Sequence, residues 1–133
     1  MKKLTIAALA LMMLTACGPK VTTGTAETAV DSEKITVEVT LEDGKVTEIA
    51  IDETYKGSTK RTLGTDYGMV AYGPAEKEWY EQVDFLQEYI ITNGVEAVVL
   101  DENGYATGDL KAGCTINIAN IMTTVNDAIA NAK

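Results

Sequence analysis

The sequence has no histidine, which excludes histidine-based catalysis and the commonest zinc sites. Cysteine and proline occur only twice each among the 133 residues. Positive charge is also scarce, because 11 basic residues face 20 acidic ones and give a net charge of −9. Nucleic-acid binding needs clustered Lys and Arg, so this balance predicts no nucleic-acid partner. The acidity is interpreted as a solvated surface.

The amino terminus has the pattern of a sorting signal. Lys2 and Lys3 precede an apolar run, residues 4–14, that is short for a permanent membrane span. The run ends in Leu-Thr-Ala-Cys17, which resembles the lipobox of bacterial lipoproteins. The resemblance implies that residues 1–17 are a signal peptide with its lipobox and that Cys17 is acylated after cleavage. The alternative is an ordinary signal peptide with an incidental cysteine.

A lipobox places the mature protein on the extracytoplasmic face of the cell membrane, held in the lipid bilayer through Cys17. Two or three acyl chains anchor a protein stably, whereas one does not. Loss of Lys2 and Lys3 leaves nine basic residues against 20 acidic ones, a net charge of −11. That charge predicts little adhesion to anionic headgroups beyond the anchor. The released fragment could also serve as a peptide pheromone, a role on which the rest of the chain has no bearing.

The mature chain is predicted to be a tether followed by one domain. Residues 18–33 are rich in Thr, Ala and Gly and are interpreted as a flexible polar tether, with an average reach of roughly 20–25 Å. Residues 34–133 suffice for one domain with one core.

The hydrophobic pattern predicts an α+β domain with a small antiparallel sheet and packed helices. The predicted elements are strands at 34–42 and 45–53 joined by a turn at Asp43-Gly44, a loop at 54–73, a helix at 75–92 opened by Pro74, a turn at 101–104 and a helix at 116–131. Residues 95–100 fit either a short helix or a strand.

The segment Asp109-Leu-Lys-Ala-Gly-Cys-Thr115 resembles the flavinylation motif of FMN-binding domains, Asp-x-x-Ser/Ala-Gly-Ala-Thr. That family includes the C and G subunits of ion-pumping NADH and ferredoxin oxidoreductases and small flavin-bearing bacterial lipoproteins. The resemblance implies the family fold over residues 34–133. It also implies FMN joined to Thr115 as a phosphoester by a flavin transferase. Two departures are Cys114 in place of Ala and Asn117-Ile118 in place of Thr-Ser.

The chemistry of the motif agrees with this interpretation. Thr115 supplies a hydroxyl, and Gly113 permits close approach of another molecule. The start of the predicted last helix would favour a phosphate, and Asp109 could organise the turn or orient the hydroxyl. In the alternative, Thr115 is an ordinary N-cap. Cys114 is either a small buried hydrophobe or a redox-active or flavin-linked thiol.

Residues 55–80 are the second candidate part of a flavin site. They hold five of the eight aromatic residues and four basic ones: Tyr55, Tyr67, Tyr72, Trp79, Tyr80, Lys56, Lys60, Arg61 and Lys77. A flavin ring needs an aromatic or apolar wall, for which Tyr67, Tyr72 and Trp79 are the candidates. These side chains could instead only pack the helix and pin the loop.

The sequence contains no recognisable catalytic group and predicts an electron carrier rather than a stand-alone enzyme. Asp101, Asn103 and Asp109 lack the ligand spacing of an EF-hand, so no metal site is predicted. The first hypothesis is a membrane-anchored FMN carrier that exchanges electrons with membrane or soluble redox partners. The second is a surface lipoprotein of the same fold without flavin, which binds a small ligand or a partner or acts as an antigen.

Overall fold

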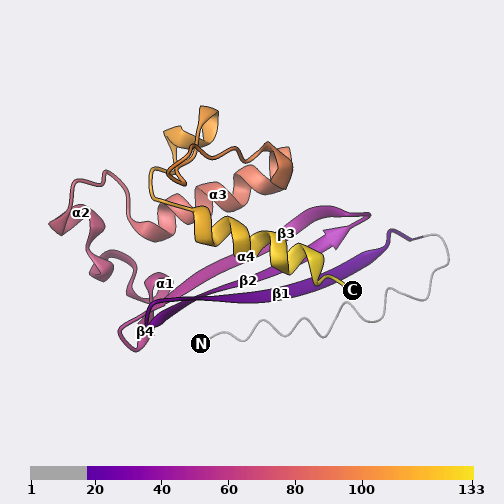
Figure 1. Ribbon diagram of the computed structural model, residues 1–133, viewed down its shortest axis with the longest axis horizontal. Coiled ribbons are helices and arrows are strands. Elements are labelled where there is room, and N and C mark those ends of the chain that lie inside the picture. The colour runs from indigo at the N-terminus through magenta and orange to yellow at the C-terminus, as the bar shows by residue number, and fades with distance from the viewer. Residues whose placement is uncertain (1–17) are drawn as a thin grey trace.

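A computed structural model describes residues 18–133, so the predicted signal peptide, lipobox and acylated Cys17 lie outside the described residues. The chain forms an α+β structure in which a four-stranded antiparallel sheet, in the order β1-β2-β3-β4, packs against three helices (Figure 1). The predicted fold class is therefore confirmed at this level.

The chain first forms a meander of four strands and then a series of short and long helices. The strands are β1 (Val21–Val30), β2 (Glu33–Glu42), β3 (Lys45–Tyr55) and β4 (Ser58–Thr59); the α-helices are α1 (Lys60–Leu63), α2 (Met69–Tyr72), α3 (Trp79–Asn93) and α4 (Ala119–Ala130); and the 3-10 helices are η2 (Gly64–Tyr67), η3 (Val95–Ala97) and η4 (Gly108–Ala112). The predicted hairpin of β2 and β3 is confirmed, with its turn at Asp43 and Gly44, both at positive φ.

The predicted tether at 18–33 is wrong, because most of it is strand β1. This strand pairs with β2 from Val21↔Glu42 to Val30↔Glu33. Its covered face carries Gly24, Ala26, Thr28 and Val30, and the small size of the first three made the segment resemble a linker. Threonine favours strands, however, and the two-residue alternation of β1 suits a sheet with one covered face.

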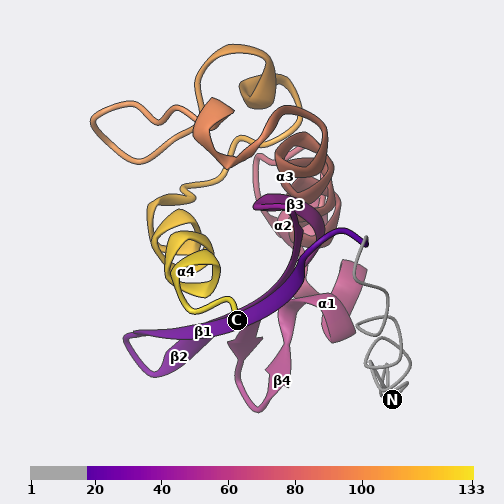
Figure 2. The ribbon, with the colours of Figure 1, turned by 90° about the vertical axis from the view of Figure 1, so that its right-hand side faces the viewer.

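Helices α3 and α4 lie over the same face of the curved sheet and enclose the core (Figure 2). The core consists of the inward side chains of β2 and β3 and the apolar stripes of the two helices, among them Val37, Val39, Ile51, Val83, Leu86, Ile90, Ile121 and Val125. Helix α3 begins at Trp79 and not near Pro74, because Glu78 and Glu81 form a capping box there. Residues 18–133 contain no helix long and apolar enough to cross a bilayer.

The predicted loop at 54–73 is instead folded into β4, α1, η2 and α2. Arg61 holds α1 in place through three hydrogen bonds. Its Nε donates to the Ile51 carbonyl at 2.6 Å, and its terminal nitrogens donate to Asp84 at 2.6 Å and to Gln87 Oε1 at 2.7 Å. Glu78 is buried and accepts the backbone N–H groups that open α2, at Met69 and Val70, both at 3.2 Å. The sheet, α3 and the short helices are thus joined by polar contacts.

Candidate functional site

Thr115 lies in the segment between η4 and α4, where its side chain is exposed. Its hydroxyl donates to Oε1 of Gln82 at 3.1 Å. The same oxygen accepts the backbone N–H groups of Thr115, at 2.8 Å, and Ile116, at 3.2 Å. The position of the Thr115 hydroxyl is therefore set by a side chain of α3.

The predicted placement of Thr115 at the start of the last helix is wrong. Helix α4 begins at Ala119, with Ile118 at the cap position, so neither the N-cap interpretation nor the helix-dipole argument applies to Thr115. Asn117 Oδ1 accepts the Ala119 N–H at 3.0 Å and takes part of the capping role. The helix starts late because residues 114–118 are held by α3 and by the turn at Gly104, whose carbonyl accepts the Ile118 N–H at 3.0 Å.

Gln82 was missed by the sequence analysis. Its side chain is 2% exposed, and its Nε2 donates to the Lys77 carbonyl at 3.0 Å while its oxygen accepts three donors. A signal for it exists in the sequence, because Gln82 lies on the apolar stripe of α3 between Trp79 and Val83. A polar residue at such a position needs buried hydrogen-bond partners.

Gly113 does not provide the open approach predicted for it. A Cβ at this position would overlap the ring of Phe85, with the Cδ2 atom at 2.6 Å. Gly113 is buried under that ring, so the glycine lets the η4 segment pack against α3. Asp109, predicted to orient the hydroxyl, lies exposed in the first turn of η4, and the hydroxyl is bonded to Gln82 instead.

Cys114 has no exposed surface. Burial raises the pKa of its thiol to about 11, against a weaker opposing effect of a hydrogen bond with the backbone of Ile116. A thiolate is the reactive form, so this cysteine is inert at neutral pH. The structure favours the interpretation of Cys114 as a small buried hydrophobe.

The raised pKa of Cys114 predicts a pH dependence of stability. Between pH 9, the ordinary pKa of the thiol, and pH 11 the unfolded chain loses this proton while the folded chain keeps it. The free energy of unfolding should therefore fall as pH rises through this window, by up to about 1.4 kcal/mol per pH unit from this group. Urea unfolding at pH 8 and pH 10.5 measures it. In Cys114→Ala this part of the fall should vanish; an equal fall in both proteins would contradict the assignment.

Two adjoining hollows lie beside Thr115. One, of about 450 Å³, is lined by Met69, Gly73, Pro74, Ala75, Tyr105, Thr115, Ile116 and Asn117. The other, of about 270 Å³, is lined by Val30, Ile35, Glu53, Lys60, Tyr67, Met69, Trp79, Ile116, Asn117, Asn120 and Ile121. They share Met69, Ile116 and Asn117, so the predicted residues Thr115, Tyr67 and Trp79 line one connected surface.

The second hollow combines aromatic rings with a cation. The Lys60 ammonium pairs with Glu53 at 2.8 Å and lies 5.0 Å from the ring centre of Tyr67 and 5.5 Å from that of Trp79. Both charged side chains are largely buried, at 13% and 15% exposure. Tyr67 also packs edge-on against Tyr55, with ring centres 4.9 Å apart. The wall is therefore apolar and aromatic, and the positive charge of Lys60 within it is offset by Glu53.

Tyr72 is not part of this wall. Its side chain is 91% exposed at the end of α2, and it lines neither hollow. The prediction that it contacts a cofactor is therefore not supported by its position. Trp79, by contrast, is 3% exposed in the core and also lines the aromatic hollow. Its position agrees with a packing role and leaves it available as part of a cofactor wall.

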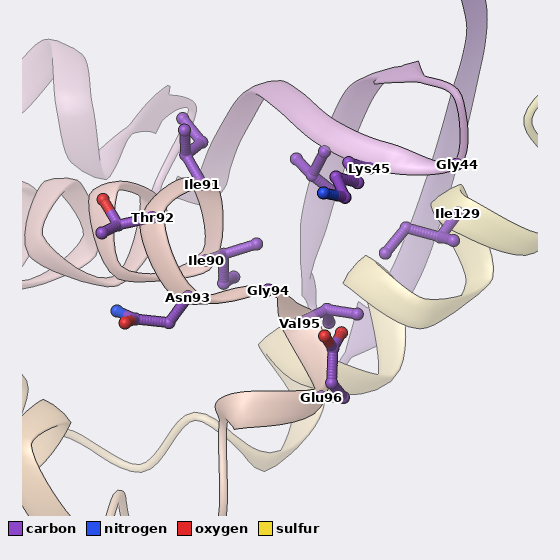
Figure 3. A pocket seen from close by; sticks show the side chains of 11 residues that line it. Gly44, Lys45, Ile90, Ile91, Thr92, Asn93, Gly94, Val95, Glu96 and Ile129 are labelled. Carbon is purple, nitrogen blue, oxygen red and sulfur yellow. The ribbon is translucent and has the colours of Figure 1, made fainter.

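A further hollow, of about 280 Å³, lies away from the motif (Figure 3). It is formed by the turn between β2 and β3, the carboxyl end of α3 and Ile129 of α4. Lys45 and Glu96 are its only charged lining residues, and Ile90 and Ile129 point into it (Figure 3). It brings together none of the predicted site residues.

Two of the three residues considered for a metal, Asp101 and Asn103, belong to the turn at 101–104, and the third, Asp109, lies in η4. Asp101 Oδ1 accepts the N–H groups of Asn103, at 2.9 Å, and Tyr105, at 3.0 Å. These backbone hydrogen bonds lower the pKa of Asp101. Within the part of the chain that the structure describes, no cluster of three or more Cys, Asp or Glu side chains could hold a metal ion.

Comparison with known proteins gives no relative for this chain: no protein family, no curated protein and no solved structure matches it. The assignment of function therefore depends on the residues and on their arrangement.

Proposed function

We propose that this protein is a lipid-anchored flavoprotein of the extracytoplasmic membrane face, with an FMN-binding-like domain that carries FMN on Thr115 for electron transfer. The observation that supports it most directly is the position of the Thr115 hydroxyl. It is exposed on the wall of a hollow that adjoins the aromatic and cationic hollow of Tyr67, Trp79 and Lys60. The residues present therefore fit a phosphate-linked aromatic cofactor.

The chain's own residues would bind and orient this cofactor. Attachment by a flavin transferase would join Thr115 Oγ1 to the flavin phosphorus while the phosphoanhydride bond of a flavin dinucleotide donor breaks. The nucleoside monophosphate would leave, and the hydroxyl proton would pass to a base of the transferase. Gln82 would hold the acceptor hydroxyl beforehand. Tyr67 and Trp79 would form the wall for the ring, and Lys60, whose charge Glu53 offsets, would lie against the same rings. The bound FMN would supply the electron-transfer chemistry. A covalent bond suits an extracytoplasmic protein because a diffusible cofactor would be lost.

The second candidate is a surface lipoprotein of the same fold that carries no flavin and binds a small ligand or partner, or acts as an antigen. Gly113 favours it, because this motif residue is explained by packing against Phe85. Asn117 favours it as well, since it stands in place of the usual Thr and serves the start of α4. The aromatic hollow would then be the place for the ligand.

Substitution of Thr115 tests the proposal. The full chain is co-expressed with a flavin transferase in an export-competent bacterium. The mass of the proteolytic peptide that carries Thr115 is then measured by mass spectrometry. We expect the mass increase of an FMN phosphoester in the natural protein and in Thr115→Ser, which keeps the hydroxyl, and none in Thr115→Ala. Circular dichroism of the three proteins controls for folding. The spectra should agree, because the exposed side chain of Thr115 contributes little to the stability of the fold. An unmodified peptide from the natural protein, or covalent flavin retained in Thr115→Ala, would contradict the proposal.

A further inference from the structure

The first hydrogen bonds of the described fold lie within three residues of the predicted lipid anchor at Cys17. The Lys20 N–H donates to Asp43 Oδ1 at 3.0 Å, and the Asp43 N–H donates to the Lys20 carbonyl at 2.9 Å. Strand β1 begins one residue later, at Val21. Only Gly18 and Pro19 separate Cys17 from Lys20, a reach of about 11 Å at most. An acylated Cys17 would therefore hold this end of the sheet at the membrane surface.

The candidate flavin site lies at the other end of the sheet. Val21 pairs with Glu42 at the anchored end, whereas Val30 and Ile35, at the turn between β1 and β2, line the aromatic hollow. Nine residue steps of a strand separate the two ends of β1, which corresponds to about 30 Å. In Figure 1 the start of β1, the turn between β2 and β3 and the chain's carboxyl terminus gather at one end, and β4, α1 and α2 lie at the other.

The distribution of charge favours contact between the membrane and the anchored end of the domain. It disfavours contact through either flank, that is, the uncovered face of the sheet or the outer face of α3. The uncovered face of the sheet carries Glu38 and Glu48, and the outer face of α3 carries Glu81 and Glu88. Anionic headgroups repel such faces.

The anchored end has a balanced set of charges. Lys20, Lys45 and Lys133 lie there with Glu42, Asp43 and Glu96. Lys133 is held to Thr23 by two backbone hydrogen bonds of 3.0 and 3.2 Å. None of these lysines takes part in an ion pair within residues 18–133, so their ammonium groups are free to meet lipid phosphates.

We infer that the domain stands on an anionic bilayer with the end formed by Lys20, Asp43 and Lys45, and that the site at Thr115 and Trp79 opens toward the aqueous phase. The orientation rests on the proposed acylation of Cys17 and not on flavin, whereas the conclusion about the electron partner also rests on the proposed FMN at Thr115. Electron transfer slows steeply with distance, and the length of β1, about 30 Å, separates the anchored end from the hollow that would hold the flavin ring. A redox group inside the bilayer would therefore be out of reach of that flavin. The electron partner at this site is then a soluble protein or the water-exposed domain of a membrane protein.

Fluorescence quenching tests this orientation. The acylated full-length protein is reconstituted into vesicles of phosphatidylglycerol and phosphatidylethanolamine that contain a phospholipid with a nitroxide on its headgroup. A fluorophore is placed on one introduced cysteine at a time, in a Cys114→Ala background. The exposed positions are Thr92→Cys at the anchored end, Glu38→Cys and Glu88→Cys on the flanks, and Thr65→Cys near the site. We expect strong quenching at position 92, at least threefold weaker quenching on the flanks and none at 65.

A matched variant tests the short connection. Ten Gly and Ser residues inserted between Pro19 and Lys20 add an average reach of about 17 Å and should remove most of the quenching at position 92. Flotation of the vesicles separates this inference from the proposed function: a protein that fails to float lacks the anchor, and the proposed anchoring then fails. In a protein that floats, strong quenching at 38, 88 or 65, or its absence at 92, overturns the orientation whether or not flavin is bound.

Discussion

Gly24→Ala should unfold the protein at a temperature roughly 10–20 °C below that of the natural chain, because it separates α4 from the sheet. A Cβ on Gly24 would overlap the Ala128 carbonyl oxygen and lie 2.8 Å from the Ala132 nitrogen. Both are backbone atoms that cannot rotate away, so the helix must shift. Overpacking of this kind costs about 2.5 kcal/mol, and each kcal/mol lowers the melting temperature of a domain this size by about 4–8 °C.

Gly113→Ala is the matched control, because the atoms nearest to the added methyl group would belong to the side chain of Phe85 and not to the backbone. That ring is 36% exposed and can rotate toward solvent, so a loss near 1 kcal/mol is expected. Thermal unfolding followed by circular dichroism compares the two. Equal melting temperatures for Gly24→Ala and the natural protein would show that β1 is not packed beneath α4. That result would restore the interpretation of residues 18–33 as a tether.

The hairpin and the two long helices could be predicted because their hydrophobic periods are strong. Residues 34–42 alternate with a period of two, and the apolar residues of α3 and α4 recur at helical spacing. Strand β1 could not be recognised in the same way. Its covered face carries Gly24, where α4 approaches too closely for a larger side chain, and the small residue Ala26. The alternation therefore lacks the usual contrast between apolar and polar residues. The structure of this segment therefore depends on a tertiary contact, the packing of α4 against β1.

The residues of the candidate site likewise divide into those that the sequence could predict and those that it could not. The motif and the aromatic segment named Thr115, Tyr67 and Trp79, which the fold brings to adjoining hollows. The sequence could not show that Tyr72 faces outward, because α2 has only four residues and no periodicity to reveal. It also could not reveal that Gln82 holds Thr115, because 33 residues separate them along the chain.

Gln82→Leu should lower the free energy of unfolding by about 3 kcal/mol and loosen the segment that carries Thr115. Leucine has nearly the same volume but accepts no hydrogen bond, so the N–H groups of Thr115 and Ile116 lose their partner. Leaving a buried donor unsatisfied costs about 1–3 kcal/mol. Urea unfolding measures the loss, and amide hydrogen exchange at 115 and 116 should become at least tenfold faster than in the natural protein.

Thr115→Ala distinguishes two contributions of Gln82 to stability: its hydrogen bonds to the N–H groups of Thr115 and Ile116, and its hydrogen bond to the Thr115 hydroxyl. It removes only the hydrogen bond at 3.1 Å from an exposed side chain, so its expected cost is below 1 kcal/mol and the two N–H groups stay protected. Gln82→Glu retains an acceptor for those groups and should protect them better than Gln82→Leu. Unchanged exchange at 115 and 116 in Gln82→Leu would mean that another group satisfies these donors. The structure would then offer no positioning role for Gln82 in the attachment of a cofactor.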